Sequence, residues 1–190
     1  MTAAETVLFA LLALEVLLRV LLEVREARAL GGKPDRFAVF RVVPIVNDIF
    51  PAEANPVRRK SGGAFEAAHE RAHKKEHHKI VRVLFLCGCG LFCALALVAA
   101  GEELRFNLFE RLVLFHLMLS VSRIFFHFVC FAEEYEADAI AVRKVQKGVA
   151  RRALESLAAE EFPRTPLFAL VYRKHPTAAM RIEKVLGKHS

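Results

Sequence analysis

The chain has 190 residues, of which 55% are hydrophobic, and its formal net charge is +7. Its mean hydropathy of +0.31 lies above that of ordinary soluble domains, so apolar and basic residues must be segregated along the sequence, as they are in membrane proteins. The length leaves room for one compact unit, and the absence of a stacking-aromatic platform or a glycine-rich phosphate loop excludes a nucleic-acid-binding protein.

The first expected element is an apolar helix over residues 6–24, which contains the charged residues Glu15 and Arg19. Because these residues stand four apart, they share a helix face and can neutralise each other against protein. Residues 1–5 are acidic and no small-residue cleavage site follows the helix, which argues against a signal peptide. We therefore predict an uncleaved first membrane span.

Residues 37–46 are rich in β-branched and aromatic side chains, and Pro44 confines such a segment to the edge or end of a sheet. We expect a short β edge segment here. Proline and glycine at residues 51–56 and 61–63 then predict a loop before the next helix.

A helix over about residues 64–79 carries His69-Glu70-Arg71-Ala72-His73, a match to H-E-x-x-H. Residues four apart lie on one helix face, so both imidazoles can bind one tetrahedral zinc ion, with Glu70 close to its fourth coordination position. The pattern alone also fits a solvated basic helix with clustered histidines, and we interpret His78, in the Lys- and His-rich run that follows, as solvated. A catalytic zinc needs a third protein ligand from elsewhere in the chain.

Two further spans are expected at residues 80–100 and 108–132, joined by a turn at residues 101–107. A span of about 21 residues reaches roughly 31 Å at 1.5 Å per residue, enough to cross the hydrocarbon core. The four cysteines of the chain lie inside these spans, where they behave as small hydrophobes and not as a structural zinc site.

The third span carries a stripe of four polar residues: His116, Ser120, Arg123 and His127. At about 100° per residue these side chains share one helix face, and continuing the helix places Glu134 and Asp138 on that face too. Polar residues inside a membrane face either a hydrated cavity or a neighbouring helix. The stripe therefore lines a groove towards a metal, or it makes interhelical hydrogen bonds, for example between Arg123 and Glu15.

Three motifs, taken in order, resemble peptidase family M48, the Ste24 and HtpX group of integral-membrane zinc proteases. H-E-x-x-H is followed, after two spans, by Glu134-Tyr135-Glu136-Ala137-Asp138-Ala139-Ile140-Ala141, which matches E-[FY]-x-A-D-x-x-A. His175-Pro176-Thr177-Ala178-Ala179-Met180-Arg181 then resembles H-P-x-x-x-x-R. The resemblance covers residues 60–185, although Arg71-Ala72 replaces the family's common apolar-Gly pair and residues 47–50 match its N-A-x-A segment only loosely.

The resemblance implies three ligands for one zinc ion per chain: His69, His73 and Glu134. It makes Glu70 the general base that takes a proton from water, and His175 a hydrogen-bond donor to the oxyanion. Asp138 orients a zinc-bound imidazole, and Arg181 holds a carboxylate or positions its loop. His78 also matches a histidine that follows the motif in Ste24-type members, although the Lys- and His-rich run favours the solvated interpretation. An edge strand at residues 37–46 binds the substrate backbone by strand addition.

The predicted fold is a single, mainly α-helical, membrane-embedded peptidase domain over residues 1–190. It has three transmembrane helices, a small cytoplasmic gluzincin-type zinc protease unit and the short β edge segment. A basic amphipathic helix at residues 142–157 packs on the catalytic helix or lies along the anionic inner leaflet. Residues 24–79 carry twelve Lys or Arg residues, whereas the opposite side is acidic, so the active site faces the cytoplasm and the N-terminus lies outside.

The predicted function is that of a multi-pass zinc endopeptidase of the cell membrane, which cleaves membrane, misfolded or prenylated proteins. Quality control is favoured over processing of prenylated peptides. The expected partners are protein or peptide substrates and the lipid bilayer, with no nucleic acid, and the oligomeric state stays open. The alternative is a catalytically silent, metal-binding membrane scaffold of the same family, although all four catalytic positions are intact.

Overall fold

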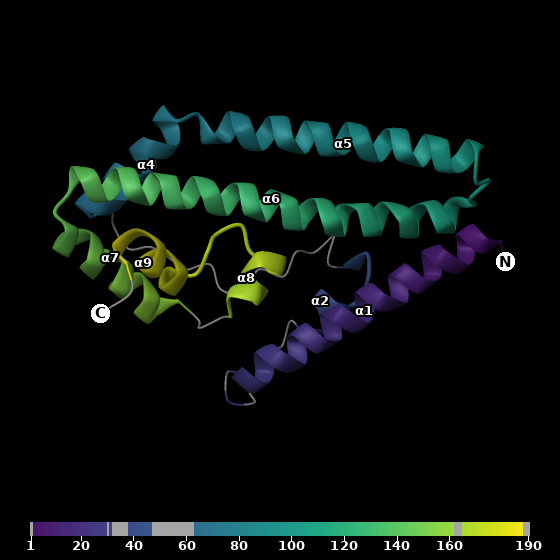
Figure 1. Cartoon of the computed structure of the whole chain (residues 1–190), viewed down its shortest axis with the longest axis horizontal. Coiled ribbons are helices and arrows are strands. Elements are labelled where there is room, and N and C mark those ends of the chain that lie inside the picture. The colour runs from purple at the N-terminus through teal and green to yellow at the C-terminus, as the bar shows by residue number, and fades with distance from the viewer. Residues whose placement is uncertain (1, 30, 32–37, 47–62, 162–164, 188–190) are drawn as a thin grey trace. The chain divides into compact units, whose positions relative to one another are not determined.

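The computed structural model describes residues 2–29, 31, 38–46, 63–161 and 165–187 (Figure 1). These residues form eight helices and no strand, which confirms a mainly helical fold. The helices are α1 (Ala3–Ala29), α2 (Ala38–Val42), α4 (Ala64–Lys75), α5 (His78–Glu102), α6 (Leu108–Lys144), α7 (Lys147–Glu160), α8 (Pro166–Tyr172) and α9 (Ala178–Leu186). They divide into two compact units. Unit 1 comprises residues 1–52 and 85–125, and unit 2 comprises residues 53–84 and 126–190.

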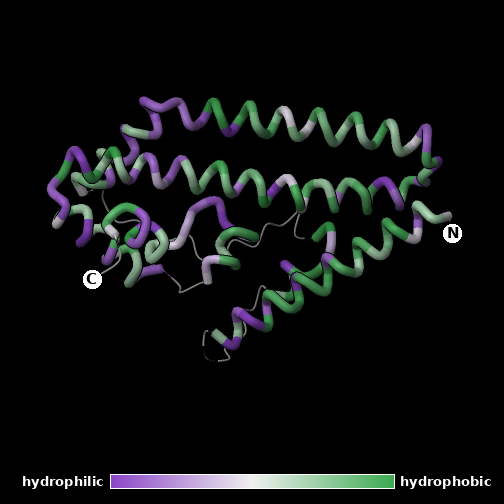
Figure 2. Tube along the Cα trace, in the orientation of Figure 1, coloured by the Kyte–Doolittle hydropathy of each residue, from purple (hydrophilic) through white to green (hydrophobic). Residues whose placement is uncertain are grey.

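Two helices, α5 and α6, are long and apolar enough to cross a membrane, and they correspond to the second and third predicted spans. Figure 2 shows hydrophobic residues along most of α5, whereas hydrophilic residues gather where α4 meets α5. Helix α6 continues past residue 132 to Lys144, so Glu134 and Asp138 extend the helix of the polar stripe, as predicted.

The predicted first span is not confirmed as a span. Helix α1 is 27 residues long, but acidic and basic side chains interrupt its apolar sequence, and it is not among the helices apolar enough to cross a membrane. The helix itself and its internal ion pair are as predicted, because Arg19 contacts Glu15 at 2.7 Å.

Polar contacts in unit 1 hold α1 against α6. Arg19 Nη2 donates to Ser120 Oγ at 3.0 Å, and His116 Nε2 lies 2.7 Å from Glu15 Oε2. In unit 2, a further member of the polar stripe, His127, donates through Nδ1 to the Leu170 carbonyl at 2.6 Å. Of the two interpretations of the stripe, these contacts bear out interhelical hydrogen bonding.

The predicted β edge segment at residues 37–46 is wrong, because residues 38–42 form the short helix α2. The reason is tertiary. The buried Arg41 donates twice to the carboxylate of Glu23, at 2.6 and 2.8 Å, and the Arg41 carbonyl accepts from Arg19 Nη1 at 2.8 Å. These contacts with α1 outweigh the weak β propensity of the segment. Residues 47–50, the loose N-A-x-A match, lie outside the described residues.

The core of unit 2 is formed by α4, α7 and α9 together with the end of α6. Phe65 and Ala68 of α4 pack with Ala150 and Leu154 of α7 and with Leu186 of α9. Of the two predicted positions for the basic amphipathic helix, packing on the catalytic helix is therefore confirmed. That helix starts at Lys147 and not at residue 142, because α6 runs on to Lys144.

We expect Leu154→Ala to destabilise unit 2 by about 2–5 kcal/mol, because Leu154 is only 1% exposed and its removal leaves a cavity between α4 and α7. Leu167→Ala is the matched control, since Leu167 is 40% exposed. Thermal unfolding of the detergent-solubilised variants measures the difference. Equal midpoints for the two variants would contradict this core.

Candidate metal centre

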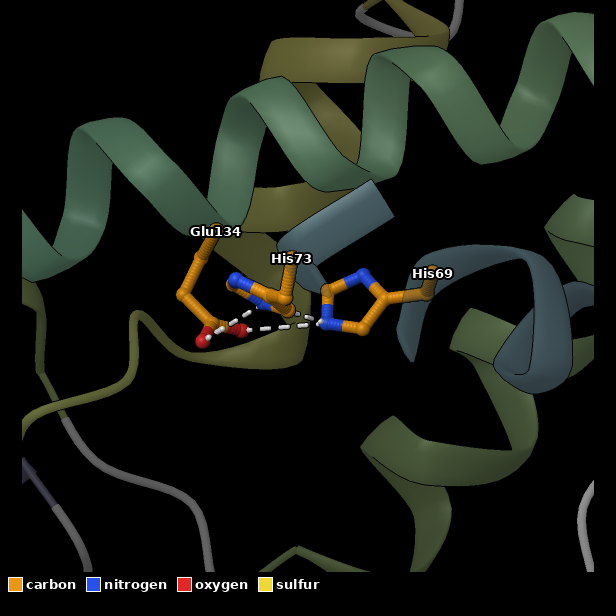
Figure 3. A group of neighbouring side chains, drawn as sticks. All are labelled: His69, His73 and Glu134. Atoms are coloured by element: carbon orange, nitrogen blue, oxygen red, sulfur yellow. Dashed lines mark hydrogen bonds and ion pairs between the residues drawn. The ribbon is translucent and has the colours of Figure 1, made fainter. Parts of the chain in front are cut away.

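Helices α4 and α6 bring three potential metal ligands together. His69 and His73 lie one turn apart on α4, and Glu134 comes from α6. Figure 3 shows both imidazoles and the carboxylate pointing toward one another. His69 Nε2 lies 3.0 Å from His73 Nε2 and 3.5 Å from Glu134 Oε2, and His73 Nε2 lies 3.4 Å from Glu134 Oε1. The three predicted zinc ligands therefore form one cluster.

These distances fit a tetrahedral zinc ion. Ligand atoms at about 2.0–2.1 Å from zinc are separated by roughly 3.3 Å along each edge of a tetrahedron. The three observed separations, 3.0, 3.4 and 3.5 Å, lie around that value. Without a metal, the two imidazole nitrogens at 3.0 Å can share one proton as an N–H···N hydrogen bond, and a metal ion would take the place of that proton. Two histidines and one glutamate leave a fourth position open, as catalytic zinc sites do.

Asp138 holds His69 from the side opposite the cluster. His69 Nδ1 donates to Asp138 Oδ1 at 2.8 Å, which leaves Nε2 free to bind a metal. Burial by itself lowers the pKa of His69, but hydrogen bonds to Asp138 and Glu134 outweigh burial and raise that pKa above its ordinary value. The same carboxylates stabilise a metal cation in place of the proton. Asp138 thus lies where the sequence comparison expected an orienting acid.

Arg181 pairs with the same aspartate. Its Nε donates to Asp138 Oδ2 at 2.7 Å and its Nη2 donates to Asp138 Oδ1 at 2.6 Å. The start of α9 positions this arginine, because Thr177 Oγ1 caps the helix by accepting from the Met180 N–H at 3.2 Å, and Glu161 accepts from the Ala178 N–H. Of the two predicted roles, holding a carboxylate describes what Arg181 does in this structure.

The two predicted catalytic side chains are both exposed, and one of them contacts the cluster. His175 is 55% exposed, and its Nδ1 lies 2.9 Å from Glu134 Oε1. Glu70 lies on α4 directly after His69, and its side chain is exposed. Both residues are therefore accessible from solvent, unlike the buried His69 and Glu134.

Arg82 is a further neighbour of the cluster that the sequence interpretation missed. It lies near the start of α5, pairs with the buried Glu133, and places its Nη2 3.5 Å from Glu134 Oε1. The sequence did contain a signal for Arg82: it lies inside the predicted span at residues 80–100, where a charged residue needs a partner of opposite charge.

The interpretation of His78 as solvated is wrong, because His78 is buried at 4% exposure and its Nδ1 lies 2.7 Å from His73 Nδ1. On one continuous helix, His78 would lie about 140° around the axis from His73, on another face. Helix α4 instead ends at Lys75, and His77 adopts a left-handed backbone with φ 56° before α5 begins. This break turns His78 towards His73.

Comparison with known protein families gives one result. Residues 64–189, about two-thirds of the chain, match the model of peptidase family M48, a family of zinc metallopeptidases. The matched region begins with α4 and includes all three clustered ligands. No curated protein and no solved structure gives a significant match to the chain.

We expect the protein purified in detergent to contain about one zinc ion per chain, measured by elemental analysis. His69→Ala and Glu134→Ala should lose that zinc, since each removes one of three ligands, and changes even to the partners of ligands cost 10- to 100-fold in affinity. His77→Asn is the control, because His77 is an exposed histidine on the same segment and asparagine tolerates its left-handed backbone. Unchanged zinc in both ligand variants would rule out this site.

Proposed function

The chain belongs to peptidase family M48, and from this membership and the geometry of the cluster we propose that it is a membrane-bound zinc endopeptidase. The observation that carries the proposal is the convergence of His69, His73 and Glu134, with the exposed Glu70 next to His69 in the sequence. Three protein ligands and one open position describe a catalytic zinc, whereas a structural zinc has four protein ligands.

Each side chain of the site then has a chemical task in peptide hydrolysis. Zinc, when bound, supplies Lewis-acid chemistry that polarises the scissile carbonyl and acidifies water. Glu70 accepts the proton of the attacking water and passes it to the leaving amine. Glu70 is exposed and is not a member of the ligand group, so in this proposal its carboxylate serves proton transfer and not metal binding.

His175 and Arg181 support the reaction in different ways. His175 is half exposed and bonds Glu134 through one nitrogen, so rotation of its side chain can direct an N–H at the developing oxyanion. Arg181 is buried and neutralises Asp138, which keeps that carboxylate ionised and available to orient His69. Arg181 is therefore a positioning residue in this proposal.

The proposed substrates are membrane or misfolded proteins, with prenylated proteins as a second class. The two apolar helices α5 and α6 support a membrane location for the enzyme, and hence for its substrates. Residues 38–46, the described part of the segment expected to bind the substrate backbone as an edge strand, contain no strand, and residues 47–62 lie outside the described part of the chain. The proposed substrates are thus inferred from the membrane location of the enzyme, and not from a strand that binds the peptide backbone.

The proposed location is the cell membrane, with the active site in the cytoplasm. Helices α5 and α6 follow each other with only residues 103–107 between them, so as a membrane hairpin they return the chain to one side. The cluster draws on residues both before and after this hairpin, which requires that arrangement. The excess of basic residues at positions 24–79 supports a cytoplasmic location for this side.

Cysteine labelling on intact cells tests the topology. In a background without the four native cysteines, a probe at Ala3→Cys should react from outside, whereas probes at Lys60→Cys and Lys147→Cys should react only after permeabilisation, because positive residues remain in the cytoplasm. The reverse labelling pattern would place the active site outside the cell.

Glu70→Gln separates a peptidase from a silent scaffold. The change preserves side-chain size and all three metal ligands, so zinc content and thermal stability should match wild type. Loss of the general base should lower cleavage of an unfolded casein-like or membrane protein substrate by about 10²- to 10⁴-fold. Glu76→Gln, the same chemical change at the end of the same helix, should leave cleavage unchanged.

If wild type and Glu70→Gln cleave equally, the observed hydrolysis does not come from this site. If wild-type protein with zinc bound cleaves nothing across a broad substrate panel, the catalytically silent scaffold takes the place of the peptidase.

A further inference from the structure

Three side chains in contact with one another lead from the metal cluster toward the surface of unit 2. His73 Nδ1 lies 2.7 Å from His78 Nδ1, and His78 Nε2 lies 3.3 Å from Glu136 Oε2. His73 comes from α4, His78 is the first residue of α5, and Glu136 lies on α6. His78 is 4% exposed, whereas the Glu136 side chain is 56% exposed. The chain of contacts thus starts at a ligand and ends at a solvated carboxylate.

When a metal is bound, the hydrogen bonds between His73, His78 and Glu136 allow only one placement of the protons on the two imidazole rings. His73 turns Nε2 toward His69 and Glu134, so a metal takes the lone pair of Nε2 and the proton of the neutral ring sits on Nδ1. That Nδ1–H donates to His78 Nδ1, which must then be the acceptor nitrogen. The proton of His78 therefore lies on Nε2 and donates to Glu136, because a carboxylate can only accept.

The backbone between α4 and α5 is built so that His78 reaches this position. The Glu76 N–H closes α4 on the Ala72 carbonyl, and His77 takes a left-handed conformation at φ 56°, which non-glycine residues seldom adopt. The turn sets the His78 ring edge-on against His73, with ring centroids 4.8 Å apart and an interplanar angle of 78°. An unfavourable backbone conformation at a site points to a requirement of that site.

We propose that His78 is a positioning residue that fixes His73 for metal binding, with Glu136 holding the tautomer of His78. The inference rests on the proposed function in that it requires zinc to bind His73. Each histidine ligand is then held by a carboxylate of α6. Asp138 contacts His69 directly, and Glu136 acts on His73 through His78. Such partners fix ring orientation and raise the basicity of the ligand.

A role for His78 as a fourth metal ligand does not fit the geometry. Its Nδ1 contacts the nitrogen of His73 that points away from Glu134, on the far side of the imidazole from the cluster. Among the described residues, the group whose ligand atoms lie close enough to share an ion is His69, His73 and Glu134.

The variants His78→Asn and His78→Leu test the proposal, because their side chains have the same shape and differ in hydrogen bonding. The asparagine amide oxygen takes the place of His78 Nδ1 and can accept from His73, whereas leucine cannot. His77→Asn is the control, an exposed histidine next in sequence that tolerates asparagine at positive φ. Zinc affinity is measured in detergent by competition with a chromophoric chelator, and cobalt substitution reports ligand geometry through its visible absorption spectrum.

We expect His78→Leu to bind zinc about 10- to 100-fold more weakly than wild type, the cost typical of losing a partner of a histidine ligand. His78→Asn should stay within a few-fold of wild type, and His77→Asn should not differ from it. The cobalt spectrum should shift in His78→Leu and remain close to wild type in His78→Asn. Thermal unfolding of the metal-free proteins checks that both His78 variants are folded.

Two results would overturn the proposal. One is a zinc affinity of His78→Leu equal to that of His77→Asn. The other is equal weakening in His78→Leu and His78→Asn, which would make His78 a packing residue and not a hydrogen-bond partner. Failure of the peptidase function is distinguishable, because a wild-type protein that binds zinc but cleaves nothing still shows the affinity difference between the two His78 variants.

Discussion

The carboxylate of Asp138 is fully buried, and three helices meet at its two oxygens. It lies on α6, accepts from His69 on α4, and accepts twice from Arg181 on α9. A buried charge is costly unless it is paired and hydrogen-bonded, so removing either partner leaves a charge that the interior cannot solvate. The positions of α4, α6 and α9 are therefore linked through one side chain, and the orientation of the first metal ligand follows from that link.

The family resemblance, together with helical spacing, was sufficient to predict the cluster and insufficient to predict its surroundings. His69 and His73 are one turn apart on a helix that does form, and Glu134 and Asp138 are one turn apart on another, so period and motif placed them correctly. His78 was assigned to solvent because it lies in a Lys- and His-rich run, and the helix break at a non-glycine residue that turns it inward was not foreseen. A chain turn made at positive φ by histidine carries no strong sequence signal, unlike one made by glycine.

The fold was predictable where hydrophobicity decided it. Long apolar segments became α5 and α6, and the amphipathic segment after them became α7, packed on α4. The segment around Arg41 formed a helix despite β-branched and aromatic neighbours, because its buried guanidinium pairs with Glu23 on α1. Such a pairing joins residues 18 positions apart and leaves no trace in local propensity.

The order of residues along the chain also determines the order in which the site is completed during synthesis. His69 and His73 are made first, Glu134 and Asp138 follow some sixty positions later, and Arg181 follows Asp138 by 43 positions. Until Arg181 has been made, the carboxylate of Asp138 lacks the guanidinium that neutralises it in the finished protein. The ligands of a growing chain are thus present before the arginine that neutralises Asp138, so the metal centre is completed only after α9 has been made.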